Sequence, residues 1–395
     1  MLNRNFIVIL FGNVILGSAM PMLIILGGLA GAWLAPQSWL ATAPPSAQML
    51  VGIVVATPIS LFMGRFGRRA GFLLGACLIV VGGIVGATAL TIHSFILLCT
   101  AHVILGGALI CVNYFRFAAA EAVPNKHQAR AISFTLAFGL IAAFMGPELF
   151  TYAKDLLAPT PLAGAYLAMS VLGVLGALPV LGLNLPKPQL KTHVGERTSG
   201  WHVLKRNPRV SAAIGIAALS QAMMVLLMTP TPLAMIGFGF GEDQAADVIR
   251  WHVIAMFAPG FFTGSLIQRF GAERIAALGL VLLLSSAGVG FAGIGLVNFY
   301  GSLVLLGIGW NFGFIGGTHL LQSALSADER PLMQGINDTI LAVAASAASL
   351  LSGVLFAGIG WVGMVTLSAP LLGAISLVLL WQNSKLKRRG HDEAS

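Results

Sequence analysis

The chain has 395 residues, of which 57% are hydrophobic and only 9% are charged, and its formal net charge is +9. A soluble domain carries about 25% charged residues, so this composition excludes a protein that covers itself with a water-facing surface. The positive residues gather in every second loop between apolar runs, which is typical of cytoplasmic loops in a membrane protein and not of a nucleic-acid-binding surface.

The apolar runs predict about twelve membrane-spanning helices, since a spanning helix needs roughly 20 apolar residues. The 48 glycines and the lack of alternating polarity favour tightly packed helices over a β-barrel. In chain order the expected helices are 5–34, 46–63, 70–92, 95–120, 131–152, 163–184, 210–236, 244–268, 273–294, 297–323, 331–357 and 361–382. The sequence therefore predicts an all-α integral membrane protein.

Charge divides the chain into four expected parts. The stretch 35–45 carries no charge and is expected outside, whereas the basic stretch 63–69 is expected in the cytoplasm. A long polar segment at mid-chain predicts a cytoplasmic linker, and the basic end of the chain predicts a cytoplasmic tail. The parts are an N-terminal six-helix bundle over 1–185, a linker over 186–209, a C-terminal six-helix bundle over 210–384 and a tail over 385–395.

A short motif occurs twice, about half a chain apart. Arg65-Phe66-Gly67 follows the second expected helix, and Arg269-Phe270-Gly271 follows the eighth. An offset of 269 − 65 = 204 residues predicts a six-plus-six repeat.

The surrounding residues resemble the loop signature of the major facilitator superfamily, Gly-x-x-x-Asp-Arg-x-Gly-Arg-Arg. Ser60 replaces the first glycine and Gly64 the aspartate, but the arginines and second glycine remain; in the second copy Gln268 replaces the aspartate. The resemblance implies the two-bundle fold of that superfamily. Because the aspartates are missing, it does not predict the usual charge latch between helices.

Two apolar helices carry sulfur and imidazole side chains at a spacing of four, which places each pair on one helix face. Met224 and Met228 form MxxxM, and His252 and Met256 form HxxxM. Met228 and His252 each lie 12 residues from Phe240, and Met224 and Met256 each lie 16 residues from it. Two antiparallel helices that meet near Phe240 would therefore pair Met228 with His252 and Met224 with Met256, as two rungs. Thioether and imidazole suit Cu(I). An imidazole inside a membrane helix also needs a partner or a cavity.

These motifs resemble the CcoA-like copper importers of the superfamily. The resemblance implies a copper importer of the bacterial inner membrane, with both termini cytoplasmic, that moves Cu(I) inward by alternating access for assembly of cbb3-type cytochrome c oxidase. It implies Met224, Met228, His252 and Met256 as the metal ligands, copper as the transported substrate without a resident cofactor, copper donor and acceptor proteins, and a monomer.

One alternative is a carrier for a small organic solute. Other members of the wider family resemble riboflavin transporters, and Trp251, Trp310 and Phe314 could line an aromatic cavity. Drug–proton antiport is less favoured, since Glu148-Leu149 replaces the paired glycines after Gly146-Pro147. A non-transporting sensor usually has a larger soluble part than this linker and tail provide.

Several single residues are further candidates. Met20 and Met22 flank Pro21 in the first helix and could pass copper along, against a packing role at a kink. The remaining candidates are lone histidines or membrane charges, with possible roles in solute contact or proton relay: His102, His319, Arg116, Glu121, Glu148 and Asp338.

No enzymatic motif is present. The sequence has no phosphate-binding GxxxxGK[ST] run and no Ser/His/Asp set with a plausible aqueous site. The cysteines Cys77, Cys99 and Cys111 lie in apolar segments without CxxC spacing and are interpreted as packing residues.

Overall fold

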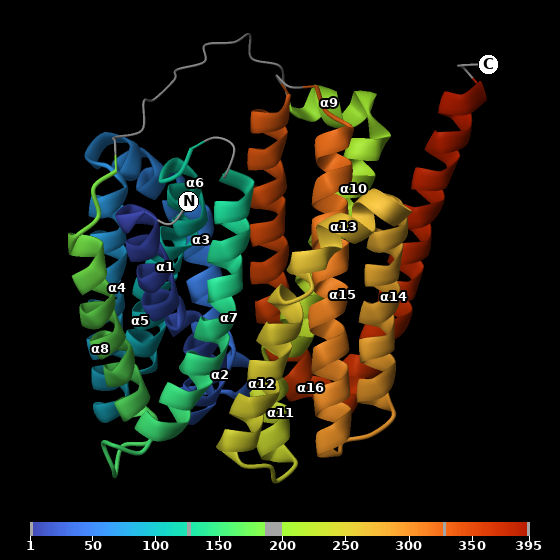
Figure 1. Cartoon of the computed structure of the whole chain (residues 1–395). Coiled ribbons are helices and arrows are strands. Elements are labelled where there is room, and N and C mark those ends of the chain that lie inside the picture. The colour runs from blue at the N-terminus through green and yellow to red at the C-terminus, as the bar shows by residue number, and fades with distance from the viewer. Residues whose placement is uncertain (1–2, 125–127, 186–199, 327–328, 393–395) are drawn as a thin grey trace. The chain divides into compact units, whose positions relative to one another are not determined.

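The computed structural model describes residues 3–124, 128–185, 200–326 and 329–392, and every regular element in those ranges is a helix (Figure 1). The chain divides into two compact units. Unit 1 comprises Met1–Lys191 and Thr229–Phe257, and unit 2 comprises Thr192–Met228 and Ala258–Ser395.

Unit 1 contains most of the first half of the sequence together with two helices of the second half. Its elements are α1 (Arg4–Gly17), α2 (Ala19–Leu34), a short 3-10 helix (Ser38–Leu40), α3 (Ala43–Phe66), α4 (Arg68–Thr91), α5 (Phe95–Asn113), α6 (Phe115–Glu121), α7 (Gln128–Ala153), α8 (Ala163–Leu181), α11 (Thr231–Gly237) and α12 (Glu242–Phe257). Helix α4 packs against α5 and α8, and α12 packs against α7.

Unit 2 contains α9 (Gly200–Arg206), α10 (Pro208–Met228), α13 (Gly260–Phe270), α14 (Ala272–Phe291), α15 (Leu296–Ser323) and α16 (Arg330–Asp392). Helices α14 and α15 pack backbone to backbone, because Gly279 of α14 faces Gly309 and Gly313 of α15 and any Cβ there would clash. Helix α9 lies inside the stretch 186–209 that is expected to be the cytoplasmic linker, of which residues 186–199 are outside the described ranges.

Four of the expected helices are broken at positions that their hydrophobic pattern does not predict. The first breaks at Ser18, whose hydroxyl donates to the Val14 carbonyl at 2.8 Å, and the fourth breaks at Tyr114. The seventh breaks before Pro230, and the eighth bends by 40° at Pro259. Proline has no backbone N–H and clashes with the preceding turn, so it interrupts the hydrogen-bond ladder.

The described residues contain nine helices long and apolar enough to cross a membrane, or ten when the bent pair α12–α13 is one span. Helix α7 adds a shorter apolar helix over Phe138–Ala153. Helix α16 counts as one of these spans, but Gly360 (φ 66°, ψ −177°) divides it into two helices. This division falls where the sequence predicts a boundary between the last two spans. With these two additions the described helices fit the twelve expected spans, and the all-α membrane fold is confirmed.

Both copies of the repeated motif end a helix in the same way. Gly67 after α3 has φ 90° and ψ 163°, and Gly271 after α13 has φ 88° and ψ 146°. Only glycine adopts this backbone region without strain. After the first copy, Arg68 donates to both carboxylate oxygens of Glu121 at 2.6 to 3.2 Å, which ties α4 to α6. A charge latch is therefore present, with its acid supplied by α6 and not by the motif.

Candidate functional site

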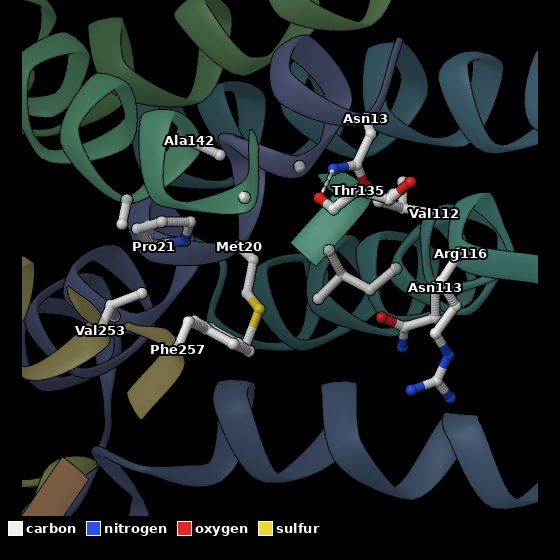
Figure 2. Close-up of a pocket in the computed structure, with 14 residues that line it drawn as sticks. Asn13, Met20, Pro21, Val112, Asn113, Arg116, Thr135, Ala142, Val253 and Phe257 are labelled. Atoms are coloured by element: carbon white, nitrogen blue, oxygen red, sulfur yellow. Dashed lines mark hydrogen bonds between the residues drawn. The ribbon is translucent and has the colours of Figure 1, made fainter. Parts of the chain in front are cut away.

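Unit 1 contains a cavity of about 250 Å³ between α1, α2, α5, α6, α7 and α12 (Figure 2). Its lining residues are Asn13, Gly17, Met20, Pro21, Leu109, Val112, Asn113, Arg116, Thr135, Gly139, Ala142, Ala143, Val253 and Phe257. None of these residues is an acid, a histidine, a cysteine or a serine, and their side chains can bind a molecule through apolar contacts and hydrogen bonds. Its walls are mainly apolar, with three amide or guanidinium side chains.

One polar group of the cavity is fixed by the helix opposite. Asn13 of α1 donates from Nδ2 to the backbone carbonyl of Thr135 on α7 at 3.0 Å, as Figure 2 shows. The Thr135 hydroxyl is turned back along its own helix and donates to the Ala131 carbonyl at 2.9 Å. The carboxamide of Asn13 is thus held in place, and its oxygen has the chemistry to accept a hydrogen bond.

The strongest polar feature lies where α5 breaks and α6 begins. Asn113 is the last residue of α5, and Arg116 is the second residue of α6. Both line the cavity and are exposed. The Arg116 guanidinium carbon lies 4.8 Å from the ring centroid of Phe117, a cation–π contact that restrains the guanidinium. Arg116 is the only charged residue among those that line the cavity.

The wall formed by α2 and α12 is apolar. Met20, at the start of α2, and Phe257, at the end of α12, extend toward one another in Figure 2, and Val253 lies one turn before Phe257. Pro21 follows Met20 directly after the break at Ser18. Gly139 on α7 leaves open space, because a Cβ built on it meets nothing within 4 Å. The open space at Gly139 and the apolar side chains of this wall suit an apolar group of a bound molecule.

Ion pairs join α7 to α12 beyond the cavity. Arg250, one turn before Val253, donates to Glu148 of α7 at 2.5 Å and to Asp247 at 2.7 Å. Lys154, directly after α7, contacts Glu242 at 3.0 Å and Asp243 at 3.2 Å. Partial burial lowers the pKa of Lys154, but hydrogen bonds and charge attraction from Glu242 and Asp243 outweigh this and raise it overall.

A buried hydrogen-bond network lies away from the cavity-lining residues. His102 of α5 contacts the Gln48 side-chain oxygen at 3.0 Å through Nδ1 and the Tyr166 hydroxyl at 2.8 Å through Nε2. An amide oxygen only accepts, so Nδ1 carries the proton and Nε2 accepts from Tyr166. The network ties α3, α5 and α8 together, which is a packing role for His102 and not the solute contact considered from the sequence.

The four predicted metal ligands are all buried, but they are divided between the units. Met224 and Met228 lie one turn apart on α10 in unit 2, and His252 and Met256 lie one turn apart on α12 in unit 1. Each pair therefore shares a helix face, and the two-rung ligand set formed from both pairs stays a prediction. Among the described residues no three His, Cys, Asp or Glu side chains gather in a way that could hold a metal ion.

The single-residue candidates have different surroundings. Met20 lines the cavity, whereas Met22 is fully buried in the protein core. Glu148 is ion-paired with Arg250, and Asp338 accepts from the neighbouring Asn337 amide at 3.2 Å. His319 is exposed and borders a separate hollow in unit 2. The polar residues that line the cavity, Asn13 and Asn113 in particular, carry no sequence motif that would have identified them.

Comparison with known proteins identifies the class. No family model matches the chain. It is 39% identical over 392 residues to the riboflavin transporter RfnT of Brucella anthropi, covering 98% of this chain and 97% of that protein. It is 28% identical to the uncharacterised MFS-type transporter YdeG of Bacillus subtilis, covering 81% of this chain and 78% of that protein.

Solved structures agree on the fold. A point mutant of the nucleoside transporter NupG superimposes with a TM-score of 0.76 at 13% identity, covering 96% of this chain and 100% of NupG. The xylose transporter XylE from E. coli superimposes with a TM-score of 0.68 at 13% identity, covering 96% of this chain and 97% of that chain. The 39% identical relative and the fold together identify a multi-pass membrane transporter, a class of protein that is not an enzyme. The chain belongs to the MFS-type transporters, the major facilitator superfamily.

The prediction of copper import is wrong. The 39% identical relative that matches nearly the whole chain is a riboflavin transporter, which favours the small-solute alternative. The MxxxM and HxxxM patterns misled because methionine is common in apolar helices and any helix places residues four apart on one face. A CcoA-like resemblance resting on four side chains does not outweigh a match over the whole length.

Proposed function

We propose that the chain is a carrier for a small, partly apolar organic solute of the flavin type, with riboflavin as the first candidate. The observation that carries this proposal is the 39% identity to a riboflavin transporter over 98% of the chain. At that identity and coverage, the two chains share the full set of membrane helices and not only a motif.

The cavity of unit 1 supports the proposal chemically. Small-molecule pockets occupy roughly 300 to 1,000 Å³ and combine apolar walls with a few placed polar groups. The cavity here, at about 250 Å³, lies just below that range and has this composition. Met20, Phe257 and the apolar walls suit a ring system, and the amide and guanidinium groups suit its carbonyl oxygens.

The membrane location and transport mechanism of the carrier are inferred from its basic loops and from its superfamily. Its basic loops favour the bacterial inner membrane with both termini in the cytoplasm. Transport proceeds by alternating access, the mechanism of carriers built from repeated helical bundles. The carrier is a monomer whose partners are the lipid bilayer and the solute, and it needs no resident cofactor.

The test is uptake of labelled riboflavin in cells that neither make nor import it. Cells that express the chain should accumulate riboflavin saturably, and their copper content should equal that of the vector control. Gly139→Leu should block uptake by filling the cavity. Gly264→Leu is the matched control, because Gly264 is also a helical glycine with nothing within 4 Å of an added Cβ but does not line the cavity. Uptake no greater than the vector control, with the chain present in the membrane, would refute the proposal.

A further inference from the structure

Two side chains at the break between α5 and α6 form a recognition edge in the cavity. Asn113 and Arg116 lie three residues apart on either side of Tyr114 and both line the cavity. In Figure 2 both side chains extend from this stretch, and the Asn113 carboxamide points toward the side of the cavity on which Met20 and Phe257 lie. The helix break matters, because it ends α5 at Asn113 and starts α6 just before Arg116 at a point where both can line the same space.

The hydrogen-bonding capacity of the pair is specific. A guanidinium only donates, whereas a carboxamide donates through its nitrogen and accepts through its oxygen. Together they offer a donor, an acceptor and a further donor. A ligand that complements them must present an acceptor, a donor and an acceptor in that order along one edge. A cyclic imide does so, with a carbonyl, a ring N–H and a second carbonyl. The flavin ring carries such an edge at its pyrimidine end and is carbon-rich at its other end.

We propose that Asn113 and Arg116 are the specificity-determining residues that bind the imide edge of the transported ring. Arg116 donates to one ring carbonyl. Asn113 accepts from the ring N–H and donates to the second carbonyl. The carbon-rich end of the ring lies against Met20 and Phe257 on the apolar wall. The inference rests on the proposed function and narrows it to heterocycles with an unsubstituted imide.

The intact carrier tests the inference without any substitution. Unlabelled lumiflavin, which keeps the imide but lacks the ribityl chain, should compete with riboflavin uptake within a fewfold of riboflavin itself. 3-Methylriboflavin, whose methyl group replaces the imide proton, should compete about tenfold or more weakly, since a site built to hydrogen-bond a group rejects the analogue lacking it. Equal competition by 3-methylriboflavin would overturn the inference. So would much stronger competition by flavin mononucleotide, because Arg116 would then be binding an anion.

Substitutions of Asn113 and Arg116 test whether these two residues distinguish riboflavin from 3-methylriboflavin. Asn113→Leu keeps the approximate side-chain size but cannot hydrogen-bond, so the KM for riboflavin should rise and the preference for riboflavin over 3-methylriboflavin should fall toward one. Arg116→Gln should raise the KM about tenfold, and Arg116→Lys should recover part of this. Arg4→Gln removes an exposed arginine that neither lines the cavity nor belongs to the repeated motif, and it should leave both values unchanged. A merely structural role for Asn113 would lower uptake of both flavins and leave their ratio intact.

Failure of the inference and failure of the proposed function give different results. If the intact chain takes up no riboflavin, the proposed function fails. If it takes up riboflavin and Gly139→Leu blocks this, but the analogue series shows no imide preference, only the inference fails. If Asn113→Leu retains uptake with the full preference for riboflavin, the imide is read elsewhere and the assignment to this pair is overturned.

Discussion

Removing the charge of Arg250 should loosen the contact between α7 and α12. Arg250 binds Glu148 of α7 at 2.5 Å and Asp247 of its own helix at 2.7 Å, and its side chain is only 17% exposed. The Glu148 side chain is 66% exposed, so solvent screens its attraction to Arg250. The Arg250–Glu148 pair therefore stabilises the contact by an amount at the lower end of the roughly 0.2 to 1 kcal/mol measured for exposed ion pairs. Loss of the positive charge also leaves Asp247 without this partner. Arg250→Gln should therefore destabilise the contact by about 1 kcal/mol, which is roughly a fivefold change in population.

Cysteine labelling measures this change. Val253 is 2% exposed and lines the cavity one turn from Arg250, so a cysteine there is protected while α7 and α12 are in contact. In a background without the native cysteines, Val253→Cys should react with a membrane-impermeant maleimide about fivefold faster when Arg250→Gln is added. The reagent is applied to each membrane face separately, and the increase is expected from the face on which the loop after α7 lies.

A charge exchange decides whether the ion pair is responsible. Because Arg250→Glu would place two carboxylates beside each other at Asp247, the exchange is made in an Asp247→Asn background. There Glu148→Arg combined with Arg250→Glu should bring the labelling rate back toward that of the Asp247→Asn protein, whereas either change alone should raise it. Asp155→Asn is the matched control for loss of a charge nearby, because the Asp155 side chain is 77% exposed and only a 3.8 Å contact joins it to Lys154. Labelling that is unchanged by Arg250→Gln, or an exchange that fails to restore protection, would refute the reasoning.

Three further predictions concern stability, measured as the melting temperature of the purified chain in detergent. Gly271→Ala should destabilise by about 1 to 3 kcal/mol, because its φ of 88° strains any side chain, whereas Gly264→Ala in the preceding helix should be neutral or stabilising; equal effects would contradict this. Tyr166→Phe should cost about 1 to 3 kcal/mol by leaving buried His102 Nε2 without its donor, and Tyr152→Phe, at a 76% exposed tyrosine, should cost nothing. The raised pKa of Lys154 stabilises the fold fully below the unfolded lysine pKa of about 10.4, and this contribution is lost as pH rises through the folded value. Lys154→Met should therefore flatten the decline in melting temperature above about pH 10, and an identical decline would exclude the effect.

The helices were predictable because a run of about 20 apolar residues admits few other structures in a membrane. The breaks were not predicted, although their causes are local. Pro230 and Pro259 stand in the sequence, but a proline in a membrane helix bends, breaks or leaves the helix intact according to its neighbours. Gly360 differs from these, because it falls at the boundary that the sequence predicts between the last two helices.

The candidate site was only partly predictable. Arg116 and Met20 could be singled out, one as a costly membrane charge and the other as a residue of the first helix. Asn13 and Asn113 could not, because their role depends on α1, α5 and α7 meeting around one space. Met224, Met228, His252 and Met256 are a different case, because their spacing of four predicts a shared helix face and the ligand set formed from both pairs stays a prediction. The function inferred from them was wrong, since the same spacing arises wherever side chains cover one helix face.

The hydrogen bonds around His102 have a consequence for exchange with solvent. Its imidazole is fully buried, and each ring nitrogen is bonded to a side chain on a different helix. The proton on Nδ1 is bonded to Gln48, so it can meet deuterated water only when the contact between α3 and α5 opens. Its exchange lifetime would therefore record how often these two helices part during a transport cycle. A lifetime much longer than one turnover would mean that α3 and α5 move as a single rigid block while the solute crosses.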